Sequence, residues 1–187
     1  MDTVDRETRS KIMASVGQKN TDAEMTLRSA LHKVGLRYRL HDRKLPGSPD
    51  LVFPRYSAVI FVHGCYWHAH DCYRATKPKT REEFWAEKFA ANKKRDARNI
   101  KRLREQDWRV LTVWECALKG KTGLPLDVLV QRTVAWLQSG ASCGTISGAR
   151  SDANGEKGKS SGRSSHGNCV ESRKVSTHRY SRSVRES

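Results

Sequence analysis

Three histidines and two cysteines fall within ten residues of this 187-residue chain, in the segment HGCYWHAHDC at positions 63–72. A further cysteine, Cys116, follows an apolar run. Structural zinc needs four nitrogen or sulfur ligands in a tetrahedron. Cys65, His70, Cys72 and Cys116 supply such a set, so the sequence predicts a structural zinc site. The alternative is a group of buried thiols beside exposed histidines, which explains the density of ligand types less well.

That ligand set leaves His63 and His68 unused, and both follow Asp50 at the start of a short apolar run. Protein sites for Mg²⁺ use one or two carboxylates with water and phosphate oxygens. A neutral imidazole is the usual general base near pH 7. The sequence therefore offers Asp50, His63 and His68 as candidate residues of a hydrolytic centre. The alternatives are that Pro49-Asp50 forms only a turn and that the histidines are structural.

The segment 81–106 has the periodicity of a long helix with polar groups on its inner arc. The residues on this arc are Trp85, Phe89, Asn92, Asp96, Ile100 and Leu103, of which the four apolar ones are predicted core residues. A polar side chain on a buried arc needs a partner. We expect Asp96 to orient a catalytic imidazole, with a salt bridge or a buried hydrogen bond as the alternative. The opposite face is basic and is expected to contact phosphates; it includes Lys93, Lys94, Arg95 and Arg98.

Three aromatic residues lie beside these groups. Tyr66 and Trp67 are inside the ligand-rich segment, and Trp85 begins the long helix. Large flat side chains on a basic surface can insert between base pairs and unstack a weak step. Burial in the core is the alternative for each of them.

The charge of the chain points to a polyanionic partner. It has 36 Lys and Arg against 20 Asp and Glu, a formal net charge of +16. Such an excess is typical of nucleic-acid binding. No apolar run approaches the roughly 18 residues of a membrane span, and the N-terminus lacks the apolar core of a signal peptide. We therefore expect a cytoplasmic protein, in which cysteines are more often metal ligands than disulfides.

Hydrophobic periodicity predicts one α/β domain at residues 1–138 followed by a tail at 139–187. The tail is basic and rich in Ser and Gly, and it lacks apolar periodicity, so we predict disorder. Residues 1–20 are expected to contain an N-terminal basic helix, at about 5–17, which carries Met13 and Val16. A capping box, Thr21-Asp-Ala-Glu24, opens the next helix, which ends at Gly35. The further predicted elements are strands at 50–53, 58–62 and 108–114 and helices at about 81–106 and 126–137.

Together these residues resemble one family. The run VIFVHGCYWHAHDCY, preceded by LPGSPDLVF and followed by TREEFWAEKFAANKKRDARNIKRLREQDWRVLTVWECAL, closely resembles the very-short-patch repair (Vsr) DNA mismatch endonucleases. TRSKIMASV resembles the family's opening segment, so the resemblance covers about residues 5–137. It implies a restriction-endonuclease-like fold, with a central mixed sheet flanked by helices and a structural zinc site. It also implies Mg²⁺-dependent nicking 5′ of the thymine in T:G mismatches that arise when 5-methylcytosine deaminates.

The resemblance assigns roles to individual residues. Asp50 corresponds to the metal-binding carboxylate, His63 and His68 to the catalytic histidines, and Glu24 to a supporting group, although Glu24 also completes the capping box. Related restriction nucleases place an acid and a lysine on the second strand. Because this chain lacks them, we expect the Val62 carbonyl oxygen to be a second Mg²⁺ ligand. The zinc ligands correspond to Cys65, His70, Cys72 and Cys116, the intercalating aromatics to Tyr66, Trp67 and Trp85, and the minor-groove residues to Met13 and Val16.

The resemblance further implies a monomer that acts on mismatched double-stranded DNA at the bacterial nucleoid, with MutL and a repair DNA polymerase as partners. Two functions of other classes stay open. A non-catalytic zinc DNA-binding module would explain the charge and the cysteines but leave Asp50, His63, His68 and Asp96 without a role. A restriction endonuclease would cut both strands of matched DNA.

Overall fold

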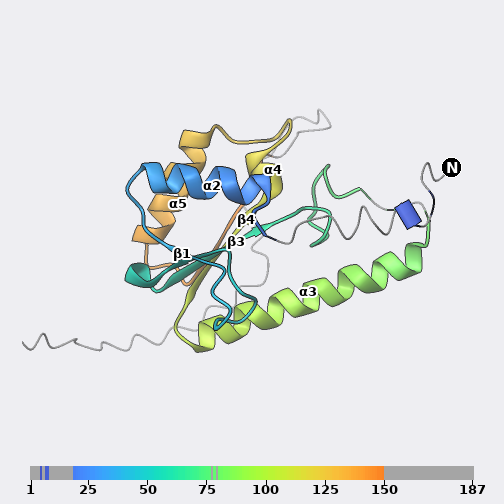
Figure 1. Ribbon diagram of the computed structural model, residues 1–187, viewed down its shortest axis with the longest axis horizontal. Coiled ribbons are helices and arrows are strands. Elements are labelled where there is room, and N and C mark those ends of the chain that lie inside the picture. Colours follow the sequence, from blue (N-terminus) through green and yellow to red (C-terminus); the bar gives the residue numbers. More distant parts are fainter. Residues whose placement is uncertain (1–4, 6, 9–18, 77, 79, 150–187) are drawn as a thin grey trace, which may run out of the picture. The chain divides into compact units, whose positions relative to one another are not determined.

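A five-stranded mixed sheet forms the centre of the protein (Figure 1). The computed structural model describes residues 5, 7, 8, 19–76, 78 and 80–149, which belong to one compact unit. The strand order is β1-β2-β3-β4-β5. The first two pairings are antiparallel and the last two are parallel. The strands are β1 (Arg39–Leu40), β2 (Leu51–Phe53), β3 (Ala58–His63), β4 (Arg109–Trp114) and β5 (Cys143–Ile146).

Helices cover both faces of this sheet. α2 (Asp22–Lys33) and α5 (Leu126–Gln138) pack on one face, and the C-terminal part of α3 (Glu82–Glu105) packs on the other. A 3₁₀ turn, η1 (Pro54–Tyr56), connects β2 to β3, and a short helix, α4 (Glu115–Leu118), follows β4 directly. The predicted α/β class with a central mixed sheet flanked by helices is therefore confirmed.

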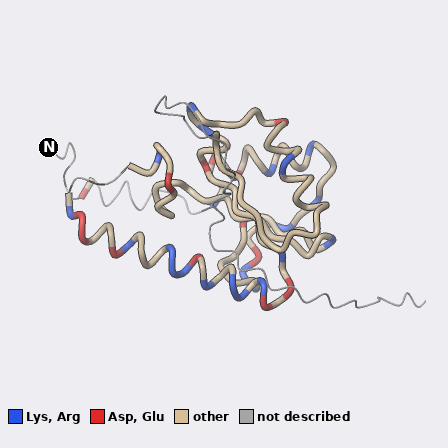
Figure 2. Tube along the Cα trace, turned by 180° about the vertical axis from the view of Figure 1, so that it is seen from behind, with Lys and Arg blue, Asp and Glu red and all other residues tan. Residues whose placement is uncertain are grey.

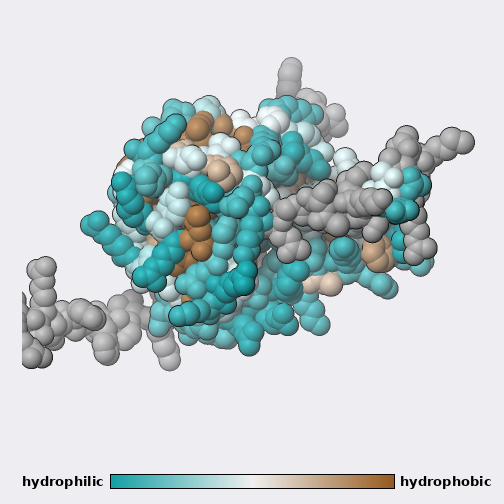
Figure 3. Space-filling model, viewed as in Figure 1, coloured by the Kyte–Doolittle hydropathy of each residue, from teal (hydrophilic) through white to brown (hydrophobic). Residues whose placement is uncertain are grey.

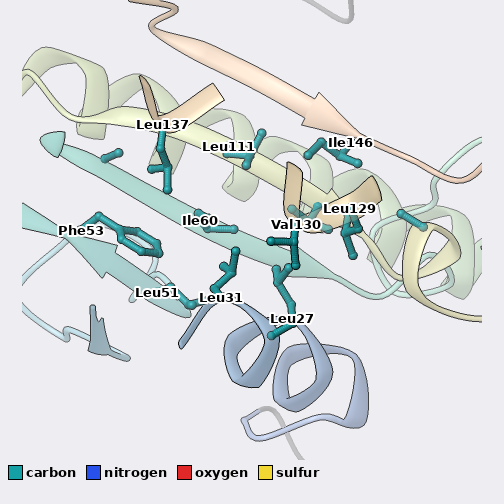
Figure 4. Packing of buried hydrophobic residues seen from close by; sticks show 14 residues of the cluster. Leu27, Leu31, Leu51, Phe53, Ile60, Leu111, Leu129, Val130, Leu137 and Ile146 are labelled. Atoms are coloured by element: carbon teal, nitrogen blue, oxygen red, sulfur yellow. The ribbon is translucent and has the colours of Figure 1, made fainter. Parts of the chain in front are cut away.

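The two hydrophobic clusters follow from the period of two along the strands. In β3, Ala58 and Ile60 join the cluster under α2 and α5, while Val59 and Phe61 join the cluster under α3. Figure 4 shows the larger cluster, in which side chains of α2 and α5 meet the sheet. Because β3 is buried on both faces, its end has a fixed position relative to both α2 and α3.

The start of α2 also follows the sequence prediction. The Thr21 side chain accepts a hydrogen bond of 3.3 Å from the Glu24 N–H. The Glu24 carboxylate accepts one of 2.7 Å from the N–H of Asn20, one residue earlier than in a standard capping box. The helix ends at Lys33, and Gly35 has a φ of +89°. This arrangement holds the Glu24 side chain inside the protein.

The inner arc of α3 is largely as predicted, with one correction. Of the four apolar arc residues, only Leu103 is buried, and Ile100 packs beside it. Trp85 and Phe89 are half-buried and belong to neither core cluster. The N-terminal half of α3 packs against the ligand-rich segment instead of the sheet, so its aromatic residues were wrongly assigned to the core.

The disordered tail was predicted to begin at residue 139, but residues 143–146 form β5. Only Ile146 of this strand is buried, so no apolar period marks it in the sequence. Its position depends on parallel pairing with β4. Arg109 anchors the preceding turn by donating hydrogen bonds to the carbonyl oxygens of Trp136, Leu137 and Ala141. Residues 150–187 lie outside the described part of the chain.

The predicted N-terminal helix lies mostly outside the described residues, as do Met13 and Val16. Of that segment, residues 7 and 8 are described and are helical. No helix among the described residues is long and apolar enough to cross a membrane.

Candidate active site and metal centre

A cleft of about 1040 Å³ opens where the end of β3 faces α3 and the start of α2. Its lining includes Asp50, Val62, His63, His68 and Asp96. Glu24 does not line the cleft, but it contacts His41, which does. The structure thus brings together the residues that the sequence predicted for catalysis, although they come from four separate segments.

Asp50 directly precedes β2 and lies beside the C-terminal end of β3. Its Oδ2 atom accepts a hydrogen bond of 2.7 Å from the Val62 N–H on the neighbouring strand. Burial raises the pKa of Asp50 to about 6; the nearby Glu24 also raises it, while the Val62 hydrogen bond opposes the shift. A cation that binds this carboxylate therefore competes with a proton at pH values below about 6.

His63 and His68 are stacked face to face, with ring centroids 3.8 Å apart and an interplanar angle of 8°. Burial lowers the pKa of His63 to about 3, and the neighbouring His68 adds to this effect. His63 is thus neutral at physiological pH. His68 Nδ1 lies 2.5 Å from Oδ2 of Asp96 on α3. This is the contact between carboxylate and imidazole that the helical arc predicted.

The carboxylate of Asp96 is ionised in this environment. Burial raises its pKa, but the hydrogen bond to His68 and nearby positive charge outweigh that effect, so the pKa is lowered. Asp96 fixes the orientation of the His68 ring. Its negative charge compensates the positive charge that the ring acquires on taking up a proton. The pair is therefore better suited to proton transfer than His63 is.

Replacing Asp96 with asparagine is expected to slow single-turnover cleavage of a T:G duplex, the substrate that the family resemblance implies, by about 10- to 100-fold. Asparagine keeps the shape of the side chain but removes its charge. Binding to the same duplex should change by no more than about twofold, because Asp96 acts on the His68 ring. Asp107→Asn, on an exposed residue just beyond α3, is the matched control and should leave the rate unchanged. Equal losses in both variants would contradict the role given to Asp96.

The four predicted zinc ligands also lie together. One ligand atom each of Cys65, His70, Cys72 and Cys116 lies within 4.8 Å of all the others. The Cys116 N–H donates to the Cys65 sulfur at 3.3 Å, and the Gly148 N–H donates to the Cys116 sulfur at 3.4 Å. Amide donors around sulfur are typical of metal-bound thiolates. The group has the composition and spacing of a metal-binding site.

Trp114 lies between the group of four candidate metal ligands and the pair of His63 and His68. It is the last residue of β4 and is paired with His63 in the sheet register. Its ring stacks on His70 at 4.1 Å and meets the edge of His63 at 5.4 Å and of His68 at 6.4 Å. Sequence analysis assigned Trp114 only to a strand, because nothing local marks its position between the two sites.

The predicted DNA-inserting aromatics form one cluster beside the cleft. Tyr66 lies 5.1 Å from Trp67 and 5.6 Å from Trp85 between ring centroids, and Phe89 joins them. The Asn92 side chain donates a hydrogen bond of 2.8 Å to the Trp67 carbonyl oxygen. This bond ties the ligand-rich segment to α3 and fixes the orientation of the cluster.

The basic face predicted on α3 is exposed and only partly borders the cleft. Lys93, Lys94 and Arg98 are exposed on α3 but do not line the cleft, whereas Arg95 does. Figure 2 shows the positive charges spaced along α3, and most of the surface over α3 in Figure 3 is hydrophilic. The cations that line the cleft come from several segments and are Lys19, Arg43, Lys88, Arg95 and Lys119.

Known proteins are similar to this chain in sequence. A family model described as DNA mismatch endonuclease Vsr matches residues 1–74. The DNA mismatch endonuclease Vsr of Escherichia coli is 46% identical over 154 residues, which cover 82% of this chain and 96% of that protein. The chain belongs to the Vsr family. The match covers 154 residues, whereas the predicted domain has only 138. The match therefore reaches into the segment predicted to be a tail.

Other relatives of this Vsr-family chain are named as nicking enzymes. Type II nicking enzyme V.XorIIP of Xanthomonas oryzae is 46% identical over 117 residues, covering 63% of this chain and 86% of that protein. Type II nicking enzyme V.NmeAIP of Neisseria meningitidis is 40% identical over 113 residues, covering 60% of this chain and 81% of that protein. Family membership confirms the predicted resemblance and the DNA endonuclease class, and the mixed sheet agrees with the restriction-endonuclease-like fold of the family.

Proposed function

We propose that this Vsr-family protein nicks one DNA strand on the 5′ side of the thymine in T:G mismatches and thereby starts very-short-patch repair of deaminated 5-methylcytosine. The observation that carries the proposal is the meeting of Asp50, the stacked His63–His68 pair and Asp96 in one cleft. The names of the relatives, which include mismatch endonucleases and nicking enzymes, support cleavage of a single strand.

We further propose that Cys65, His70, Cys72 and Cys116 hold zinc. Three cysteines and one histidine match the ligands of closed structural zinc sites. Burial raises the pKa of both Cys65 and Cys116, so these thiols are protonated without a cation. A bound dication would favour the thiolates that the amide donors are placed to stabilise.

The proposed catalytic cation is Mg²⁺, held by the Asp50 carboxylate and the Val62 carbonyl oxygen with Glu24 as the supporting acid. Hard oxygen ligands fit this choice. When bound, the ion would stabilise negative charge on the scissile phosphate and increase the acidity of water. His63, neutral and buried, orients the attacking water. His68, held by Asp96, transfers the proton.

Mismatch recognition is proposed to use the aromatic cluster. A T:G pair stacks less stably than a matched pair. Inserting Tyr66, Trp67 and Trp85 beside a T:G pair therefore requires less unstacking free energy. Lys93, Lys94, Arg95 and Arg98 would contact phosphates, together with the other cations of the cleft. Met13 and Val16 remain predicted minor-groove contacts. We place the protein in the cytoplasm, at the nucleoid, as a monomer that works with MutL and a repair polymerase.

One assay tests the proposal against its alternatives. The full chain is incubated with Mg²⁺ and either a T:G duplex or its matched T:A counterpart, with the two strands labelled differently. We expect a single nick 5′ of the mismatched thymine and no cut in the matched duplex. Cleavage of both strands of the matched duplex would support a restriction endonuclease, and binding without any cut would support a DNA-binding module.

A further inference from the structure

His41 occupies the space between two acidic residues of the site, although no motif in the sequence marks it. It directly follows β1 and begins the connection to Asp50. Its backbone N–H donates a hydrogen bond of 3.3 Å to the carbonyl oxygen of Asp50. Its φ is +47°, in the left-handed region that non-glycine residues rarely adopt. The backbone at His41 is therefore held by the same connection that presents Asp50 to the cleft.

The two ring nitrogens of His41 face the two carboxylates. Nε2 lies 3.2 Å from Oε1 of Glu24, and Nδ1 lies 3.9 Å from Oδ1 of Asp50. Nε2 is buried and has no aligned hydrogen-bond partner among the described residues. Each of the three side chains also offers a ligand atom within 4.8 Å of those of the other two. The imidazole is thus a spacer that keeps two acidic groups at a short, fixed separation.

Both oxygens of Glu24 and one oxygen of Asp50 also have hydrogen-bond donors other than His41. Oε2 of Glu24 accepts the Asn20 N–H at 2.7 Å, and Oε1 is 2.9 Å from the Arg28 guanidinium. Oδ2 of Asp50 accepts the Val62 N–H. The other oxygen of Asp50, Oδ1, faces His41. Fixing this oxygen determines the geometry that the carboxylate offers to a cation.

We propose that His41 is a positioning residue that orients Asp50 and Glu24 for the divalent cation of the cleft. The inference rests on the proposed function, since that function places the cation at Asp50. An imidazole suits this place because its nitrogens point to opposite sides of the ring and can contact one carboxylate each. A glutamine amide, which also has a polar atom on each side, can replace it in part. Loss of the bridge removes the contact at Asp50 Oδ1 and leaves the carboxylate less firmly oriented, so cation affinity falls.

The test measures Mn²⁺ binding by electron paramagnetic resonance, with the zinc-loaded full chain and no DNA. His41→Ala is expected to weaken Mn²⁺ binding by about 10-fold. His41→Gln should recover at least half of that loss on a logarithmic scale. His32→Ala removes an exposed histidine at the end of α2 and is the matched control, with unchanged binding expected. Asp50→Asn identifies the signal that belongs to the cleft. Circular dichroism of each variant shows that it is folded.

Two outcomes would overturn the proposal. Mn²⁺ affinity in folded His41→Ala that equals that of the unsubstituted protein would show that the bridge does not matter. If His41→Gln weakened Mn²⁺ binding as much as His41→Ala does, the imidazole would be a direct cation ligand rather than a positioning group. Failure of the proposed function has a different signature: the unsubstituted protein binds Mn²⁺ in an Asp50-dependent way but does not nick a T:G duplex.

Discussion

Asp50→Asn is expected to reduce nicking of a T:G duplex by at least about 100-fold, because loss of cation-mediated charge stabilisation costs several kcal/mol in the transition state. The substitution keeps an oxygen that can accept a hydrogen bond from the Val62 N–H. The contact between the start of β2 and the end of β3 should therefore persist. Affinity for the T:G duplex should stay within about threefold, since phosphate contacts dominate affinity. The two quantities are measured by single-turnover cleavage with Mg²⁺ and by binding without a divalent cation.

The same substitution is expected to stabilise the fold at neutral pH. The pKa of Asp50 is about 6 in the folded protein, above its ordinary value of 3.8. The ionised carboxylate is therefore less favourable in the folded chain than in the unfolded one. That penalty is absent below about pH 4, grows as the pH rises through the folded pKa, and reaches about 3 kcal/mol above it. Asparagine removes the penalty but accepts the Val62 hydrogen bond less strongly.

Denaturant unfolding without a divalent cation checks this expectation. Asp50→Asn should exceed the unsubstituted protein in free energy of unfolding at pH 8, and the difference should shrink at pH 5. Asp42→Asn, on an aspartate of the same connection, is the control and should alter neither stability nor nicking. If Asp50→Asn lost stability and DNA binding together with cleavage, Asp50 would be structural.

Cys116→Ser is expected to yield a protein that lacks stoichiometric zinc and is largely unfolded. Cys116 is 2% exposed and its sulfur belongs to the four-ligand group. Structural zinc contributes about 10–16 kcal/mol of binding free energy, which is comparable to the whole stability of a domain, about 5–15 kcal/mol. A serine hydroxyl is a poor zinc ligand, and its burial without metal adds a further cost. Elemental analysis and far-ultraviolet circular dichroism give the metal content and the fold.

Thr122→Val provides the matched control for the metal centre. The Thr122 hydroxyl donates a hydrogen bond of 3.4 Å to the Cys116 carbonyl oxygen, so its removal disturbs the same segment without removing a ligand. This variant should retain one zinc per chain and a cooperative unfolding transition. One zinc per chain in Cys116→Ser would refute the ligand assignment.

Local sequence determined the elements and much of the chemistry of this protein. The capping box located α2, and apolar periodicity located α3, β4 and α5, because these signals depend on residues within one or two turns of each other. The spacing of the ligand-rich segment grouped Cys65, His70 and Cys72. The arc of α3 placed Asp96 on the side that meets His68, since helical geometry alone decides which residues share a face.

Tertiary structure alone decided how these elements meet. β5 has little apolar content and depends on pairing with β4 and on the bonds of Arg109, so periodicity could not reveal it. Trp114 links the metal centre to the histidines through the sheet register, and His41 joins Glu24 to Asp50 across three segments. Contacts between residues far apart in the sequence leave no periodic signal in either partner. The cleft and the place of His41 between Glu24 and Asp50 therefore became visible only in the folded chain.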